Sequence, residues 1–178
     1  MRDTGALVVR PAEPRDVGTI HELIRALAEY EKLLPEVDAT EQQLRAALFG
    51  AQPRVFCDIA EWTAAGRTET AGFALWFYNF STFRGRHGLY LEDLFVRPEY
   101  RGRGIGHALL ANLARRCVAE QLTRLEWSVL DWNEPALRFY ASLGAAALGE
   151  WVPHRVTGEA LRSLAGPGTH ASPDPPRP

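Results

Sequence analysis

The sequence has few of the features that mark secreted, membrane-bound or disulfide-stabilised proteins. Only two of its 178 residues are cysteines, Cys57 and Cys117. They stand far apart in apolar surroundings, which favours two buried thiols over a disulfide or a metal pair. No apolar run approaches the ~18 residues of a membrane span, and the N-terminus lacks the apolar segment of a signal peptide. We therefore expect a cytoplasmic protein that makes no membrane contact.

Several catalytic signatures are missing as well. The chain has no H-E-x-x-H or C-x-x-C pattern, so we expect no metal, and it has no G-x-S-x-G serine motif. Its net charge of −2 gives no reason to expect nucleic-acid binding. A chain of 178 residues with 46% hydrophobic residues predicts one folded domain that buries roughly two-thirds of its unfolded surface.

Hydrophobic periodicity predicts an α/β protein with the element order βααβββαβαβ, a mixed central sheet with helices on both faces. The domain is expected over residues 1–165, followed by a disordered tail rich in proline and glycine over residues 166–178. The expected strands are 6–10, 54–62, 70–80, 88–97, 124–130 and 150–156, and the expected helices are 14–32, 41–50, 104–120 and 133–143.

The loop after the fourth strand is the most informative part of the chain. An apolar strand ends at Pro98, and three alternate glycines follow within a few residues, at Gly102, Gly104 and Gly106. Glycines keep side chains away from the backbone, so that successive N–H groups can converge on one anion. The dipole of the following helix and the neighbouring arginines, Arg101 and Arg103, add to the attraction. The loop therefore predicts a pyrophosphate site.

The spacing of these glycines narrows the choice of ligand. No Gly-Lys pair is present, which excludes a P-loop, and the dinucleotide pattern G-x-G-x-x-G fails because it ends on His107. The pattern Arg101-x-x-Gly104-x-Gly106 instead resembles the acetyl-CoA loop of the GNAT superfamily of N-acyltransferases. Taken alone, the loop is also compatible with an ordinary glycine-rich strand-to-helix turn.

Two adjacent acids, Glu92 and Asp93, interrupt the apolar strand just before this loop. Side chains alternate along a strand, so we expect these two on opposite faces of the sheet. A buried carboxylate costs several kcal/mol unless it is paired or used, which favours a functional role. The alternative is an edge strand whose acids meet water.

A second group of residues begins after the fifth expected strand. Asn133 is a good N-cap, and Pro135 is compatible with the first turn of the helix that follows. The carboxyl end of a strand is where open α/β sheets bind ligands. Tyr140 lies two turns into this helix, and its alternative role is that of a core aromatic residue.

Together these segments resemble one GNAT family, the spermidine/spermine (diamine) and thialysine N-acetyltransferases. The resemblance covers about residues 7–165. It is carried by Val8-Val9-Arg10-Pro11-Ala12, Leu27-Ala28-Glu29-Tyr30-Glu31-Lys32-Leu33, Tyr90-Leu91-Glu92-Asp93, Pro98-Glu99-Tyr100-Arg101-Gly102-x-Gly104-Ile105-Gly106 and Val129-Leu130-Asp131-Trp132-Asn133.

The resemblance implies a homodimer and a role for each part of the site. Acetyl-CoA would be held by Leu94, Phe95, Val96, Arg101, Gly102, Arg103, Gly104, Ile105, Gly106, His107, Asn133, Pro135 and Tyr140. Tyr140 would also donate a proton to the CoA sulfur, and Glu92 would be the base. The amine would be bound by Tyr30, Glu31, Glu92 and Asp93.

The implied reaction is the transfer of an acetyl group from acetyl-CoA to a primary amine of a small molecule by direct attack. A lysine-like amine has a pKa near ~10.4, so only a fraction on the order of 10⁻³ is nucleophilic at neutral pH, and a carboxylate can help to remove its proton. The alternatives are a non-catalytic acyl-CoA-binding module and a nucleotide-binding or structural α/β domain.

The segment before the fourth strand bears on the choice of amine. Polyamine-specific members of the family carry Asp-Pro-Trp there. This chain has Phe80-Ser81-Thr82-Phe83-Arg84-Gly85-Arg86, which resembles the Ser-Thr-Trp-Lys-Gly-Arg of the thialysine enzymes. Arg84 and Arg86 should disfavour a long polycation, and they either meet the carboxylate of an amino acid or are solvated loop charges. We therefore expect a thialysine- or lysine-like amine, or a short diamine, in preference to spermine.

Overall fold

The computed structural model describes residues 5–166 and contains two compact units, one that ends at Leu130 and one that begins at Asp131. The two units are described separately below. The expected disordered tail lies outside the described residues, apart from Gly166. One acetyltransferase domain over residues 1–165 stays a prediction.

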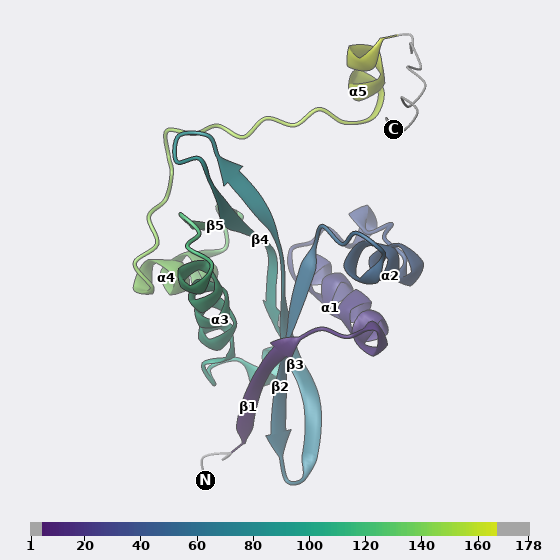
Figure 1. Cartoon of the computed structure of the whole chain (residues 1–178). Helices are drawn as coiled ribbons and strands as arrows, with labels where there is room; N and C mark the ends of the chain where they lie inside the picture. The colour runs from purple at the N-terminus through teal and green to yellow at the C-terminus, as the bar shows by residue number, and fades with distance from the viewer. Residues whose placement is uncertain (1–4, 167–178) are drawn as a thin grey trace, which may run out of the picture. The chain divides into compact units, whose positions relative to one another are not determined.

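The first unit is built on a five-stranded sheet with the order β1-β2-β3-β4-β5 (Figure 1). Its strands are β1 (Ala6–Pro11), β2 (Phe56–Ala64), β3 (Arg67–Ser81), β4 (Arg86–Val96) and β5 (Leu125–Trp127). The first four strands pair antiparallel, whereas β5 pairs parallel to β4. The predicted mixed sheet is thus confirmed, with β5 shorter than expected.

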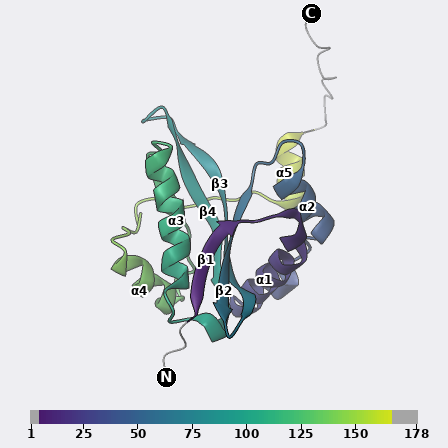
Figure 2. The ribbon, with the colours of Figure 1, turned by 60° about the horizontal axis from the view of Figure 1, so that its bottom comes forward.

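Helices cover both faces of this sheet, as predicted (Figure 2). Helix α3 (Ile105–Ala119) lies on one face, and α1 (Val17–Tyr30) and α2 (Glu41–Phe49) lie on the other. Short 3-10 turns occur at Pro14–Asp16, Leu34–Glu36 and Pro98–Tyr100. The sequence pattern Thr40-x-x-Gln43 is typical of a capping box, and these two residues form one at the start of α2.

The core of the first unit lies between the sheet and α1. Ile20 and Leu23 of α1 pack against Ile59, Phe73 and Phe95 of the sheet, and all five are buried. On the opposite face, α3 buries the predicted i+4 stripe formed by Ile105, Leu109, Leu113 and Cys117. The two cysteines are buried free thiols, as expected. The core therefore holds β4 between two helical layers, and the loop that follows β4 is exposed.

A β-bulge at Glu92 changes the faces that strand alternation predicts for β4. Leu75 of β3 lies opposite Asp93, and the next residue, Trp76, lies opposite Leu91, so that Glu92 has no opposing residue. Directly opposed residues share a face, and successive residues of β3 alternate. Asp93 therefore lies on the α1 face with Phe95, while Leu91 lies on the α3 face. Strict alternation along this strand would put Leu91, Asp93 and Phe95 on one face. That expectation holds for Asp93 and Phe95 but is wrong for Leu91, because one extra residue shifts the period-2 pattern.

Strand β5, the neighbour of β4 on the side away from β3, is short and leaves part of β4 as an open edge. Strand β5 pairs with β4 over Leu89–Leu91 only, and β4 then continues to Val96 with no strand beside it on that side within residues 5–166. The N–H of Arg97 donates to Ala71 O of the neighbouring chain segment at 2.8 Å. The preceding carbonyl of Val96 therefore points the other way, toward the open edge.

The second unit contains α4 (Glu134–Ser142) and α5 (Gly158–Ala165). Helix α4 matches the expected helix, and Gly144 just after it adopts the predicted left-handed conformation, with φ of 81°. The strand expected over residues 150–156 is not formed, and α5 was not expected. A strand needs a neighbouring strand with which it exchanges backbone hydrogen bonds, and Pro153 has no N–H to donate. The alternation of side chains in the sequence does not show whether such a neighbour is present.

Candidate functional site

The loop between β4 and α3 has the geometry of an anion cradle. Gly102 and Gly104 have positive φ values of 74° and 79°, a conformation that L side chains rarely adopt. Gly104 is the N-cap of α3, and no side chain caps this end. The first helical hydrogen bond runs from Ala108 N to Gly104 O at 2.9 Å, so the N–H groups that precede it point out of the helix start. Those of Ile105, Gly106 and His107 are thereby available to an anion.

The two arginines of this loop are held by aromatic rings on different sides. The guanidinium of Arg101 lies 5.0 Å from the ring centre of Tyr30 and 5.6 Å from that of Phe95. Arg103 lies 5.1 Å from the ring centre of Trp62 and 5.5 Å from that of Tyr100. Each contact is a cation–π interaction. The sequence predicted the positive charge of this loop but not these aromatic partners.

The open edge of β4 presents peptide groups just before the loop. The Val96 carbonyl faces this edge, and because orientation alternates along a strand, the peptide groups of Leu94 face it too. Those of Phe95 face β3, where Phe95 lies opposite Phe73. Of the three residues expected to bind a pantetheine arm, Leu94 and Val96 therefore offer backbone hydrogen bonds, whereas Phe95 offers its ring to the core.

Three carboxylates lie at the middle of β4 and the end of α1. Burial raises the pKa of Asp93 to about 6, and the negative charges of Glu92 and Glu31 contribute to the shift. Burial also raises the pKa of Glu31, which caps the C-terminus of α1. Glu92, the bulge residue, is exposed. Asp93 thus lies on the α1 face, and Glu31, which follows Tyr30 at the end of α1, is near enough for its charge to act on Asp93.

The arginines of the β3–β4 turn lie apart from these acids within one subunit. Arg84 and Arg86 are exposed, and Arg86 begins β4, seven residues before Asp93. Seven residues of extended strand span roughly 20 Å. A small amino acid whose amine lies at Asp93 therefore cannot reach these arginines of the same chain with its carboxylate.

The remaining predicted site residues belong to the second unit. The Asn133 side chain accepts a hydrogen bond from Ala136 N at 3.3 Å and so caps α4, as predicted, with Pro135 in the first turn. Tyr140 lies near the end of α4, with its ring centre 5.3 Å from that of Phe139. The approach of Tyr140 to the residues of β4 stays a prediction.

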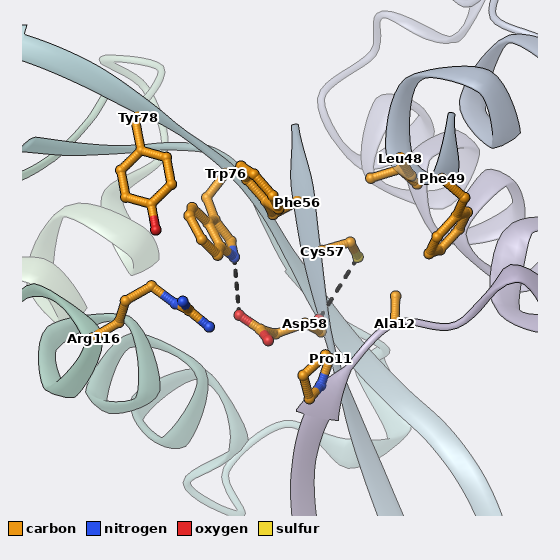
Figure 3. A pocket seen from close by; sticks show the side chains of 10 residues that line it. All are labelled: Pro11, Ala12, Leu48, Phe49, Phe56, Cys57, Asp58, Trp76, Tyr78 and Arg116. Carbon is orange, nitrogen blue, oxygen red and sulfur yellow. Dashed lines mark hydrogen bonds between the residues drawn. The ribbon is translucent and has the colours of Figure 1, made fainter. Parts of the chain in front are cut away.

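A separate hollow of about 160 Å³ opens where β1 ends, between α2, β2, β3 and α3 (Figure 3). Its floor holds Asp58, which accepts a hydrogen bond from Trp76 Nε1 at 2.9 Å, and Arg116, which lies 4.8 Å from the ring centre of Trp76. Burial raises the pKa of Asp58. None of the predicted site residues lines this hollow, so it does not belong to the candidate site.

Comparison with known proteins agrees with the acetyl-CoA loop that the sequence indicates. The family model described as the Acetyltransferase (GNAT) family matches residues 17–145. The thialysine N-epsilon-acetyltransferase of Bos taurus is 42% identical over 90% of this chain and 98% of its own length. The L-ornithine N5-acetyltransferase of Arabidopsis thaliana is 32% identical over 88% of this chain and 86% of its own length.

A solved structure agrees with the fold. An integron cassette protein from the mobile metagenome of V. cholerae superposes with a TM-score of 0.72 and 25% sequence identity, over 90% of this chain and 98% of its own. Among residues 5–166, none of the helices combines the length and the apolar character that crossing a membrane requires.

Proposed function

Since the chain belongs to the GNAT family of acetyltransferases and is an acetyl-CoA-dependent amine N-acetyltransferase, we propose that its substrate is the terminal amine of a lysine-like amino acid or a short diamine. The observation that carries this proposal is the bulge of β4, which places Asp93 on the α1 face within reach of the charge of Glu31 and leaves Glu92 exposed. Two relatives support it, because their names specify the N-epsilon amine of thialysine and the N5 amine of L-ornithine.

The loop after β4 and the open edge fit the two parts of acetyl-CoA. The N–H groups of residues 104–107 would bind the pyrophosphate at the start of α3, where the helix dipole is positive. The peptide groups of Leu94 and Val96 would hold the pantetheine arm along the unpaired edge. Arg101 and Arg103 add positive charge near the cradle while their side chains stack on rings. Asn133 and Pro135 at the start of α4 would contribute from the second unit.

The acids would bind the amine and make it nucleophilic. The protonated amine would lie between Glu31 and Asp93, where one positive charge relieves the repulsion between two partly buried carboxylates. Tyr30 would flank it. Glu92, exposed at the bulge, would accept the proton that the amine must lose, directly or through a water molecule. Attack on the thioester carbonyl would then be direct, without an acyl-enzyme intermediate.

Tyr140 would complete the reaction as the acid. If the CoA thiolate behaves like a cysteine with a pKa near ~8.5, a phenol with a pKa near ~10 can protonate it as it departs. The phenol group would regain its proton from water once the products have left.

The positions of charged side chains along β4 favour a short substrate. Glu31 and Asp93 provide for one ammonium group, and the further ammonium groups of a polycation that extends along β4 toward its start would approach the positive charges of Arg84 and Arg86. Like charges cost affinity there. A substrate with one reactive amine close to its other polar groups avoids this repulsion.

Side-by-side measurement of kcat/KM for thialysine, putrescine, spermidine and spermine tests the proposal. We expect thialysine or putrescine to lead and spermine to be the poorest of the four. A clear lead for spermine would contradict the proposed substrate class, although the enzyme would still be an amine acetyltransferase.

We further propose that the protein is a homodimer and that the segment over residues 150–156 contributes to the dimer interface. Within the second unit this segment forms neither helix nor strand, and it exposes Trp151 and Val152 by 69% and 73%. Exposed neighbouring apolar side chains on a segment that belongs to no helix or strand favour docking onto another chain.

A further inference from the structure

The side chain of Arg101 joins three parts of the first unit that the reaction uses. Its backbone belongs to the glycine loop, and its guanidinium stacks on Tyr30 at the end of α1 and on Phe95 of β4. Its Nε donates a hydrogen bond to the carbonyl of Val96 at 3.1 Å. That carbonyl faces the open edge of β4, where the preceding subsection places the pantetheine arm.

We propose that Arg101 is a positioning residue that couples acetyl-CoA binding to the amine-binding end of α1. The inference rests on the proposed function in that it uses the same two substrate positions. It assigns Arg101 a role beyond that of a positive charge beside the pyrophosphate, because the planar guanidinium is engaged by α1 and not only by the loop.

The route of the coupling is short. Tyr30 is followed directly by Glu31, whose N–H closes the helix by donating to Leu27 O at 2.9 Å. The charge of Glu31 acts on Asp93 across the α1 face. Any ligand that fixes the loop therefore also fixes Arg101, and through the Tyr30 ring it fixes the position of Glu31 opposite Asp93.

The Val96 carbonyl gives the coupling its link to the cofactor. An amide N–H of the pantetheine arm that binds at the open edge shares this carbonyl with Arg101 Nε. Cofactor binding then acts on Arg101 at two points, through the loop backbone and through the shared acceptor. An arginine that only supplied charge would need neither the hydrogen bond to Val96 O nor the contact with Tyr30.

Arg103 is the matched control for this role. It carries the same charge in the same loop, but it stacks on Trp62 and Tyr100, away from α1. Replacing either arginine by alanine removes one charge near the pyrophosphate. Arg101→Ala also removes the stacking contact with Tyr30.

The first experiment measures the dissociation constant of CoA with and without saturating thialysine, by calorimetry. Coupling is reciprocal, so in the wild type thialysine should tighten CoA binding by about two- to fivefold, the size of one or two exposed cation–π contacts. The factor by which thialysine tightens CoA binding should fall to about 1 in Arg101→Ala. It should also fall to about 1 in Arg101→Lys, which keeps the charge but lacks the planar group that stacks on Tyr30. It should persist in Arg103→Ala, even though that variant binds CoA more weakly.

The second experiment needs no amine and no turnover. Hydrogen exchange at the backbone of residues 28–33 is followed on addition of CoA. We expect CoA to slow exchange there in the wild type and in Arg103→Ala, and to leave it unchanged in Arg101→Ala and in Tyr30→Leu, which removes the ring.

Two outcomes would overturn the inference: CoA leaves residues 28–33 unprotected in the wild type, or Arg101→Ala and Arg103→Ala lose protection equally. Failure of thialysine as a substrate while CoA-dependent protection follows the expected pattern would count against the proposed amine and leave the coupling intact.

Discussion

Gly104 shows how one residue sets the cofactor loop. Its φ of 79° and its place as the N-cap of α3 let the chain turn into the helix without a side chain over the cradle. An alanine at this position has to adopt the left-handed region, at a cost of about 1–2 kcal/mol, and its methyl group enters the space above the N–H groups.

We predict that Gly104→Ala raises the dissociation constant of acetyl-CoA by at least tenfold, as measured by calorimetry. The matched control is Gly66→Ala in the β2–β3 turn, where φ is 75° and a Cβ likewise meets nothing within 4 Å. The control should lose similar stability in urea unfolding but keep its affinity. Equal affinity in both variants would refute the cradle.

Asp93 gives a second prediction at the scale of single residues, because a raised pKa in the folded state makes the free energy of unfolding depend on pH. The folded pKa of about 6 lies above the ordinary 3.8, so the ionised form is disfavoured in the native state. The native state binds the extra proton between about pH 4 and 6, and stability due to this group is therefore lost as the pH rises through that window.

Asp93→Asn should accordingly raise the free energy of urea unfolding at pH 7.5 by about 1–3 kcal/mol, and the gain should shrink toward pH 4. Activity should fall at the same time, because the ammonium loses its partner. Glu36→Gln, at an exposed position, controls for removing one negative charge. A gain in stability that does not change with pH would argue that Asp93 carries no raised pKa.

At the scale of single elements, the sequence predicted β4 well but not its bulge. The apolar alternation identified the strand and both acids. It could not show that Glu92 lacks an opposing residue, because this depends on the register of β3, which lies elsewhere in the chain. The bulge puts Leu91 on the α3 face while Asp93 stays on the α1 face with Phe95. Local patterns therefore identified the strand and its two acids, and tertiary pairing decided on which face of the sheet each acid lies.

Capping signals were equally reliable where they act locally. Asn133 and the Thr40–Gln43 pair cap their helices as predicted, since these hydrogen bonds join residues three positions apart. The strand expected over residues 150–156 did not form. Its prediction failed because a strand requires a pairing partner, and the local sequence does not show which segment that partner would be.

Helix α4 carries the prediction for Tyr140. Tyr140→Phe keeps the ring beside Phe139 and removes only the proton, so kcat should fall by about 10²–10⁴-fold while acetyl-CoA affinity and stability stay near those of the wild type. Tyr78→Phe is the control, because it removes a hydroxyl that donates to Glu120 at 2.6 Å and has no part in the proposed reaction. A kcat that falls equally in both variants would contradict the role of Tyr140.

At the scale of the whole molecule, the mixed sheet and its two helical layers followed from the order of elements, because parallel pairing of β4 and β5 requires the crossover helix α3. The assembly of chains does not follow from such rules. An interface depends on which surfaces match, and the sequence pattern carries that information only as exposed apolar residues.

We predict a dimer at micromolar concentration in light scattering, and a shift toward the monomer in Trp151→Ser. Val118→Ser, at a position of α3 that is 80% exposed, removes a comparable apolar surface away from the segment and should leave the mass unchanged. A monomeric wild type would remove the proposal of a homodimer.

The short length of β5 has a consequence for how the protein behaves when its cofactor is scarce. Beyond Leu91, no other strand within residues 5–166 pairs with this side of β4, and such edges act as templates on which other strands grow. Acetyl-CoA or CoA would pair with the peptide groups on this side and so mask the edge. The solubility of the enzyme and its tendency to precipitate during purification should therefore both depend on whether coenzyme A is bound.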